Sequence, residues 1–262
     1  MSDEMRCEAL LIGLNYVSES RMRLNGCWND AIGLHSLLTA EPYSFDPEKV
    51  YTITDMSRGD IPKCTKSAIS RSLLELARRS YSENLDIAVV SYSGHGSRQR
   101  DYSGDEADGM DEGICPIDCM RRGLLIDDDL HNIFMQFNPA TRVYAVFDCC
   151  HSGTVLDLPY CYRGAEGTEK RTLSPAEVGR KITMISGCRD TQTSADAWDR
   201  KKRQFGGALT MALLEVLHQE EAPVGACELH DRVLAILRRQ GHSQYPVISS
   251  TEPITDDCKF FV

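Results

Sequence analysis

The chain has 262 residues, of which 42% are hydrophobic and 26% are charged, as is ordinary for a soluble globular protein with a substantial core. Its net charge of −10 argues against a nucleic-acid-binding protein, which would present a basic face. The charge favours cationic partners or reflects solubility alone. The apolar run at residues 9–14 is too short for a signal peptide or a membrane span, and the eleven cysteines are odd in number and scattered. We therefore expect a cytoplasmic protein with reduced thiols and no membrane span.

Short apolar runs alternate along the chain with stretches of helical periodicity. The runs predict buried parallel strands at residues 9–14, 49–54, 87–92, 143–147 and 182–186. Helices are predicted within residues 27–38, 69–77, 130–137, 208–217 and 229–239, and a last extended piece near residues 245–249. This rhythm predicts one α/β domain over residues 1–262, with a mostly parallel sheet flanked by helices on both faces. The polar stretches 98–111 and 162–180 are predicted to be long loops, which are usually functional in compact domains.

Two of the predicted strands end in residues that are typical of nucleophilic catalysis. The strand at residues 87–92 runs into Ser93-Gly94-His95-Gly96, and the strand at residues 143–147 runs into Asp148-Cys149-Cys150. Ligands bind beyond the carboxyl ends of parallel strands, so His95 and Cys150 are predicted to meet at one edge of the sheet. A nearby imidazole stabilises a thiolate and can later protonate the leaving amine. We predict a catalytic dyad with Cys150 as nucleophile and His95 as base.

The neighbours of this dyad have their own predicted roles. The glycines beside His95 allow a sharp turn, and the Gly96 and Cys150 N–H groups are predicted to bind the developing oxyanion. His151 is a rival base and Cys149 a rival nucleophile, but neighbours on an extended segment point to opposite faces, so both are expected to face away from the cleft. A core thiol or a turn histidine is the alternative for each residue alone, and the paired placement at two strand ends disfavours it.

The sequences Tyr92-Ser-Gly-His-Gly-Ser97 and Asp148-Cys-Cys-His-Ser-Gly153 closely resemble the two catalytic motifs of metacaspases, which are relatives of caspases. Residue Cys150 follows His95 by 55 positions, similar to the separation of about 50 in caspases. The resemblance extends to residues 12–16, 24–30, 127–129 and 190–196, in the type I arrangement, and covers nearly the whole chain. It implies a caspase-like fold, a cysteine endopeptidase and a monomer.

The resemblance also implies a substrate, since metacaspases cut after Arg or Lys. The matching pocket positions are Cys27, Asp30, Ser93 and Asp148. Carboxylates suit a guanidinium or ammonium group, whereas a caspase that cuts after Asp would need arginines at these positions. Asp30 alone could instead be an acid that complements a helix N-terminus. Expected partners are proteins or peptides with Arg or Lys at the cut site.

Carboxylates are unusually dense around the predicted dyad, at Asp101, Asp105, Asp108, Asp111, Asp127, Asp128, Asp129 and Asp157. Close carboxylates repel one another unless a cation or proton intervenes, and hard oxygen ligands suit calcium. The spacing does not match an EF-hand, and the sequence alone favours a solvated acidic loop. The resemblance implies Ca²⁺ as cofactor, with ligands Asp111, Asp127, Asp128 and Asp157, and an active site that calcium makes competent.

Three further features complete the sequence-based expectations. The basic cluster at residues 199–205 contains candidate self-cleavage sites at Lys201, Lys202 and Arg203, or is an exposed basic turn. Cys115 and Cys119 lack zinc-site spacing and are expected to be core thiols. Many type I metacaspases carry a proline-rich N-terminal extension, whereas only residues 1–7 precede the first predicted strand, so we expect no prodomain in this chain.

Two other functions fit the same sequence. One is a pseudopeptidase that binds or scaffolds partners through this fold, which an intact Cys150 and His95 disfavour. The other is a redox protein that uses Cys149 and Cys150, although adjacent cysteines are strained as a disulfide.

Overall fold

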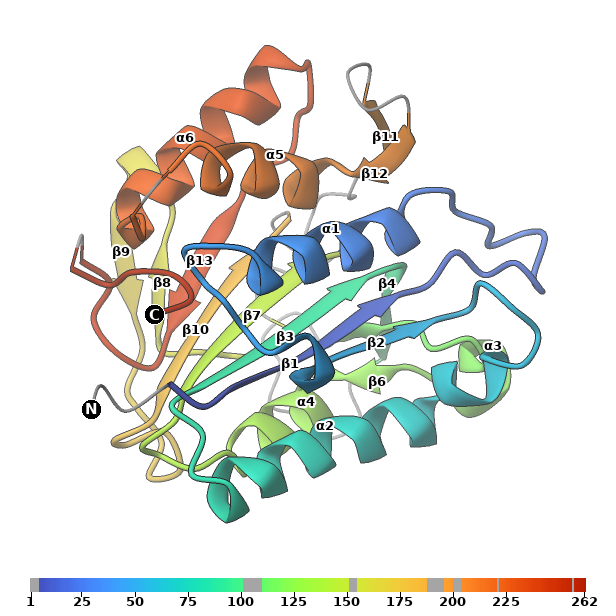
Figure 1. Cartoon of the computed structure of the whole chain (residues 1–262), viewed down its shortest axis with the longest axis horizontal. Helices are drawn as coiled ribbons and strands as arrows, with labels where there is room; N and C mark the ends of the chain where they lie inside the picture. Colours follow the sequence, from blue (N-terminus) through green and yellow to red (C-terminus); the bar gives the residue numbers. More distant parts are fainter. Residues whose placement is uncertain are drawn as a thin grey trace.

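The computed structural model describes residues 5–100, 110–150, 155–187, 196–199, 204–220, 222–255 and 257–262. An eight-stranded sheet with the order β2-β1-β3-β7-β10-β13-β8-β9 forms its centre (Figure 1). The strands are β1 (Cys7–Gly13), β2 (Val50–Thr54), β3 (Ile87–Ser93), β7 (Arg142–Asp148), β10 (Lys181–Ser186), β13 (Val247–Ser250), β8 (Tyr160–Tyr162) and β9 (Thr168–Lys170). The first five in the sheet order pair in parallel and the last three pair antiparallel, so the predicted α/β class is confirmed.

Helices cover both faces of this sheet because successive strand residues point to opposite sides. In β1, Leu10 and Ile12 pack with helices α2 and α4, whereas Ala9 and Leu11 pack with α1, α5 and α6. Figure 1 shows α1, α5 and α6 above the sheet and α2 and α4 below it. The helices are α1 (Cys27–Thr39), α2 (Lys66–Ser82), α3 (Cys119–Arg122), α4 (Asp127–Phe134), α5 (Ala208–Leu217) and α6 (Ala226–Arg239), with short 3₁₀ turns η1 (Pro47–Lys49), η2 (Ile61–Cys64) and η3 (Gly164–Glu166). In the described part of the chain, no helix is long and apolar enough to cross a membrane.

Short antiparallel strands occupy parts of the stretches that the sequence pattern predicted as loops, and for the residues in those strands the prediction was wrong. Strand β4 (Gly96–Arg100) pairs with β5 (Met110–Ile114), which pairs with β6 (Leu125–Ile126). Strand β9 lies within the other predicted loop, and β11 (Asp196–Asp199) pairs with β12 (Gln204–Gly207). These strands are short, and β4 and β9 are polar, so their main-chain ladders form without the apolar alternation that marks a half-buried strand.

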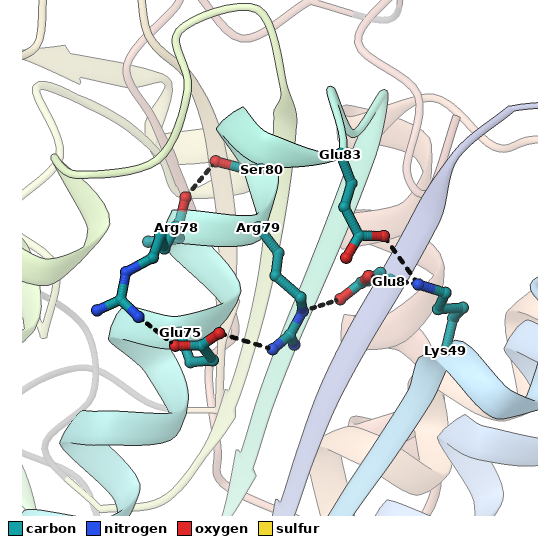
Figure 2. A network of polar contacts seen from close by, with 8 residues as sticks. Glu8, Lys49, Glu75, Arg78, Arg79, Ser80 and Glu83 are labelled. Carbon is teal, nitrogen blue, oxygen red and sulfur yellow. Dashed lines mark hydrogen bonds and ion pairs between the residues drawn. The ribbon is translucent and has the colours of Figure 1, made fainter.

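A network of ion pairs between side chains joins the elements at the amino-terminal edge of the parallel sheet (Figure 2). The Glu8 carboxylate in β1 is buried and lies 2.7 Å from Arg79 Nε of α2 and 3.3 Å from Lys49 Nζ of η1. Lys49 Nζ also lies 2.8 Å from a carboxylate oxygen of Glu83. A buried acid at this edge is therefore paired with two cations, which join α2 and η1 to the first strand.

Candidate active site

The predicted catalytic pair lies at the carboxyl edge of the main sheet. Strands β3 and β7 run side by side in parallel, with Ser93 opposite Asp148, so His95 and Cys150 each lie two residues beyond this matched pair. A Cβ on Gly96 would lie 1.9 Å from the Cys150 carbonyl oxygen and 3.2 Å from its nitrogen. Only glycine allows these two backbones to approach so closely. The structure thus brings His95, Gly96 and Cys150 together.

The ring of His95 is held by a group that the sequence did not indicate. Its Nε2 lies 2.7 Å from the main-chain carbonyl oxygen of Met22. A carbonyl oxygen only accepts hydrogen bonds, so Nε2 carries the proton and Nδ1 is left as the basic nitrogen. The side chain of Met22 is irrelevant to this bond, which explains why no residue pattern marks the position.

The two adjacent thiols differ in exposure. Cys149 is buried in the core, packed among the side chains on the α2 and α4 face of the sheet, whereas Cys150 is half-buried. This agrees with the expected alternation of the two side chains. His151, the rival base, lies outside the described residues.

The register of β4 and β5 bears on the predicted oxyanion donor. The Cys115 N–H donates to the His95 carbonyl oxygen at 2.9 Å, and Gly96 is paired with Ile114 one position further along. Hydrogen-bonded and non-hydrogen-bonded pairs alternate in an antiparallel ladder. The Gly96 N–H therefore points away from β5, which makes it available to a ligand at the sheet edge.

The predicted substrate pocket brings two carboxylates to one place. All four residues, Cys27, Asp30, Ser93 and Asp148, are buried. The Asp30 carboxylate accepts the Gly207 N–H at 2.9 and 3.0 Å, and Asp148 accepts the Thr210 N–H and hydroxyl at 2.8 and 2.9 Å. A Cβ on Gly207 would lie 2.1 Å from Asp148 Oδ2 and 2.9 Å from Asp30 Oδ2.

Both acids therefore converge on the start of α5, although Asp30 also lies in the first turn of α1, as its alternative interpretation requires. Gly207 and Thr210 were missed as members of this site. The only sequence signal for them was the Gly206-Gly207 pair just before the predicted helix.

The predicted calcium ligands are brought together in part. Asp111 of β5 and Asp127, the first residue of α4, are buried, and Asp128 is half-buried. Asp127 accepts the N–H groups of Glu112 and Asp128 at 2.8 and 3.0 Å. Burial raises the pKa of Asp127, and the nearby charges of Asp111 and Asp128 raise it further, against the lowering effect of the two N–H groups.

The fourth predicted ligand, Asp157, has a left-handed backbone with φ of 46° and lines a cavity of about 270 Å³ together with Arg163, Lys170 and Arg171. Among the described residues, no three His, Cys, Asp or Glu side chains lie close enough to hold a metal ion. Asp101, Asp105 and Asp108 lie outside the described residues. The donor set is thus chemically suited to calcium, but its described members do not converge on one point.

Two minor predictions concern other parts of the chain. Lys201, Lys202 and Arg203 lie outside the described residues, in the segment that joins the paired strands β11 and β12. Cys115 and Cys119 are buried in the core, as predicted.

These elements define an α/β protein of caspase-like fold, with a cysteine and a histidine at the carboxyl edge of a mostly parallel sheet. The crystal structure of a protein from Geobacter sulfurreducens is similar to it, with a TM-score of 0.64 and 27% sequence identity. The match covers 94% of this chain and 93% of that chain.

Sequence comparison specifies the family. A family model described as the metacaspase, peptidase C14 domain matches residues 8–159. Metacaspase-1 of Arabidopsis thaliana is 32% identical over 246 residues, which cover 90% of this chain and 66% of the relative. Metacaspase-1B of Aspergillus oryzae is 31% identical over 301 residues, which cover 97% of this chain and 70% of the relative. The chain belongs to the metacaspase family of cysteine peptidases.

Proposed function

We propose that this chain is a calcium-dependent cysteine endopeptidase that cleaves after Arg or Lys, with Cys150 and His95 as its catalytic dyad. The observation that carries the proposal is the approach of the two strand ends, where Gly96 contacts the Cys150 backbone and leaves no room for a Cβ. The Asp148 carboxylate on the same strand end provides the matching charge for a basic substrate.

In the proposed mechanism, Cys150 Sγ attacks the peptide carbonyl carbon while His95 Nδ1 takes the thiol proton. The Met22 carbonyl accepts from Nε2–H and so stabilises the imidazolium that forms. The N–H groups of Gly96 and Cys150 bind the oxyanion. Collapse of the tetrahedral intermediate expels the amine, which receives its proton from His95. Water then attacks the acyl-enzyme while His95 takes its proton. The carbon–sulfur bond breaks, the carboxylic acid product leaves, and His95 returns the proton to Cys150 Sγ.

Specificity for Arg or Lys is proposed to come from Asp30 and Asp148. Both are buried beside Gly207, where water competes weakly for a cation. These carboxylates now accept hydrogen bonds from the N–H groups of Gly207 and Thr210. A substrate guanidinium or ammonium group is expected to replace these donors or to bind the carboxylates beside them.

Calcium is proposed to act as the cation that the carboxylates of Asp111 and Asp127 require. The raised pKa of Asp127 supports this, since it reflects burial and the proximity of other acids. Asp128 and Asp157 are the other two ligands that the resemblance implies, although Asp157 lies in the cavity lined by Arg163, Lys170 and Arg171. The ion would supply charge compensation and order to this region.

The test is hydrolysis of fluorogenic peptides that differ only in Arg, Lys or Asp at the cut position, with millimolar calcium or with a chelator. We expect turnover of the Arg and Lys peptides only, in calcium only, and none in Cys150→Ala. Cys149→Ala is the matched control, because it removes the buried neighbouring thiol and is expected to retain turnover. Equal rates in chelator would refute the calcium requirement, preference for Asp would refute the pocket, and an inert wild type would favour the pseudopeptidase.

Self-cleavage at Lys201, Lys202 or Arg203 belongs to the same proposal. It is supported by the position of β12, which follows this segment and ends at Gly207 beside the two pocket carboxylates. Mass spectrometry of the intact protein after calcium addition is expected to show two fragments for the wild type and one chain for Cys150→Ala.

A further inference from the structure

The main chain of His95 is held by two buried tyrosine hydroxyls. The His95 N–H donates to Tyr16 Oη at 2.9 Å, and that hydroxyl donates to the Cys115 carbonyl oxygen at 2.7 Å. The Tyr92 hydroxyl lies 2.9 Å from the His95 carbonyl oxygen and 2.9 Å from Tyr16 Oη. Burial raises the pKa of both tyrosines well above the usual range, so both hydroxyls keep their protons as donors.

The Tyr16 hydroxyl occupies a position that a ladder bond would otherwise fill. On one side of the His95 and Cys115 pair, the Cys115 N–H donates directly to the His95 carbonyl. On the other side, the His95 N–H and the Cys115 carbonyl would bond to each other in a regular antiparallel ladder, but the Tyr16 oxygen lies between them. This oxygen spaces His95 away from the end of β5.

The same tyrosine also contacts the imidazole. The rings of Tyr16 and His95 have centroids 4.9 Å apart at an interplanar angle of 38°. A Cβ on Gly94 would lie 2.6 Å from Tyr92 Oη and 2.9 Å from Tyr16 Oη, so the turn before His95 is fitted around the two hydroxyls. One side chain thus fixes both the backbone and the ring of the proposed base.

Tyr16 is itself rigidly placed. Its φ of 53° is a left-handed conformation that a bulky residue adopts only where its surroundings enforce it. The N–H groups on either side, of Asn15 and Val17, donate to the two oxygens of the buried Asp55 carboxylate at 2.8 and 2.9 Å. The same loop supplies the Met22 carbonyl that holds His95 Nε2.

We propose that Tyr16 is a positioning residue for catalysis, which sets the distance and orientation of His95 relative to Cys150 and is assisted by Tyr92. This inference rests on the proposed function, since it assumes that His95 is the base. If the Tyr16 hydroxyl is removed, the His95 N–H loses its acceptor, while the Cys115 carbonyl oxygen keeps only the Tyr92 hydroxyl at 3.1 Å. The His95 N–H regains an acceptor by closing on that carbonyl oxygen. His95 then shifts toward β5, and misplacement of a catalytic group on this scale costs roughly a hundredfold in rate.

The test compares Tyr16→Phe with Tyr144→Phe on an Arg-containing peptide in calcium. Tyr144 is the matched control, because its buried hydroxyl also donates to main-chain carbonyls, including that of Lys259 at 2.9 Å, on the α5 and α6 face of the sheet. We expect Tyr16→Phe to lower kcat by roughly tenfold to a hundredfold with little change in KM. Here kcat is normalised to the concentration of active enzyme, measured as the Cys150 thiol that can be alkylated. The pH profile of Cys150 alkylation by iodoacetamide is expected to shift, whereas Tyr144→Phe leaves both unchanged.

The outcomes separate this inference from the proposed function. An inert wild type, or a His95→Ala variant with full turnover, contradicts the proposed function. A wild type that depends on His95, together with Tyr16→Phe values equal to those of Tyr144→Phe, contradicts the positioning role alone. If Tyr16→Phe does not fold, Tyr92→Phe replaces it, with an expected loss of roughly threefold to tenfold in kcat. A kcat and pH profile for Tyr92→Phe equal to the control would then overturn the proposal.

Discussion

Two buried acids, Glu8 and Asp127, differ in the charges that surround them. Glu8, at the amino-terminal edge of the main sheet, lies within 3.3 Å of the side chains of Arg79 and Lys49. Asp127, the first residue of α4, accepts two main-chain N–H groups. Burial raises its pKa, and the nearby carboxylates of Asp111 and Asp128 raise it further. Glu8 thus has its charge compensated by cations of the same chain, whereas Asp127 is grouped with other acids and belongs to the site where we propose that calcium binds.

The largest expected effect comes from a third buried acid, Asp148, which lies at the carboxyl edge of the main sheet in the proposed substrate pocket and is changed to Asn. Asn keeps an oxygen that can accept from Thr210 but removes the charge that we propose binds a basic substrate. We expect kcat/KM on Arg peptides to fall by roughly a hundredfold, about 2.7 kcal/mol, with less change in thermal stability. Glu8→Gln makes the same chemical change at the other edge and is the control. An equal loss of kcat/KM in both variants would contradict the division between the two edges.

The next effect concerns calcium and Asp127. At a concentration about 100 times its Kd, an ion that binds only the folded state stabilises it by about 2.7 kcal/mol. We expect calcium to raise the Tm of the wild type, as measured by circular dichroism, and Asp127→Asn to abolish that increase. Magnesium at equal ionic strength controls for screening. An unchanged calcium response in Asp127→Asn would remove this residue from the ligand set.

The smallest expected effect is on stability alone. Glu8→Gln leaves Arg79 and Lys49 without their buried partner, and the free energy of unfolding is expected to fall by about 2 kcal/mol. The loss is smaller than for a fully buried pair because the Lys49 side chain is 39% exposed. Arg78→Ala, which breaks an exposed contact with Glu75 in the same network, is the control and should cost below about 0.5 kcal/mol in urea denaturation (Figure 2). A fall in kcat for Glu8→Gln would contradict its purely structural role.

The parallel core was predictable because burial on both faces gives long apolar runs. All seven residues of β3 are buried, and the predicted strand at residues 87–92 is only one residue shorter. Strand β4 was not predictable, since its five residues are glycine, serine, arginine and glutamine, and only main-chain pairing with β5 makes it a strand.

The residues of the candidate site also fall into those that the sequence could predict and those that it could not. The placement of His95 and Cys150 at one edge of the sheet was predictable, because each follows an apolar run that the sequence predicts as a strand. Met22 acts through a carbonyl that every residue has, and Tyr16 reaches His95 across 79 positions of the chain, so neither could be found without the fold. The convergence of Asp30 and Asp148 became visible only when Gly207 was placed between them.

The position of β13 has a consequence for any chain cut between β11 and β12. Strand β13 comes from the last part of the chain, yet it is inserted between β10 and β8, and α5 and α6 cover one face of the same sheet. A cut there would separate two polypeptides that share a continuous sheet and a common hydrophobic core. The two pieces are expected to migrate apart on a denaturing gel but together on a native one, as a single complex of two complementary fragments.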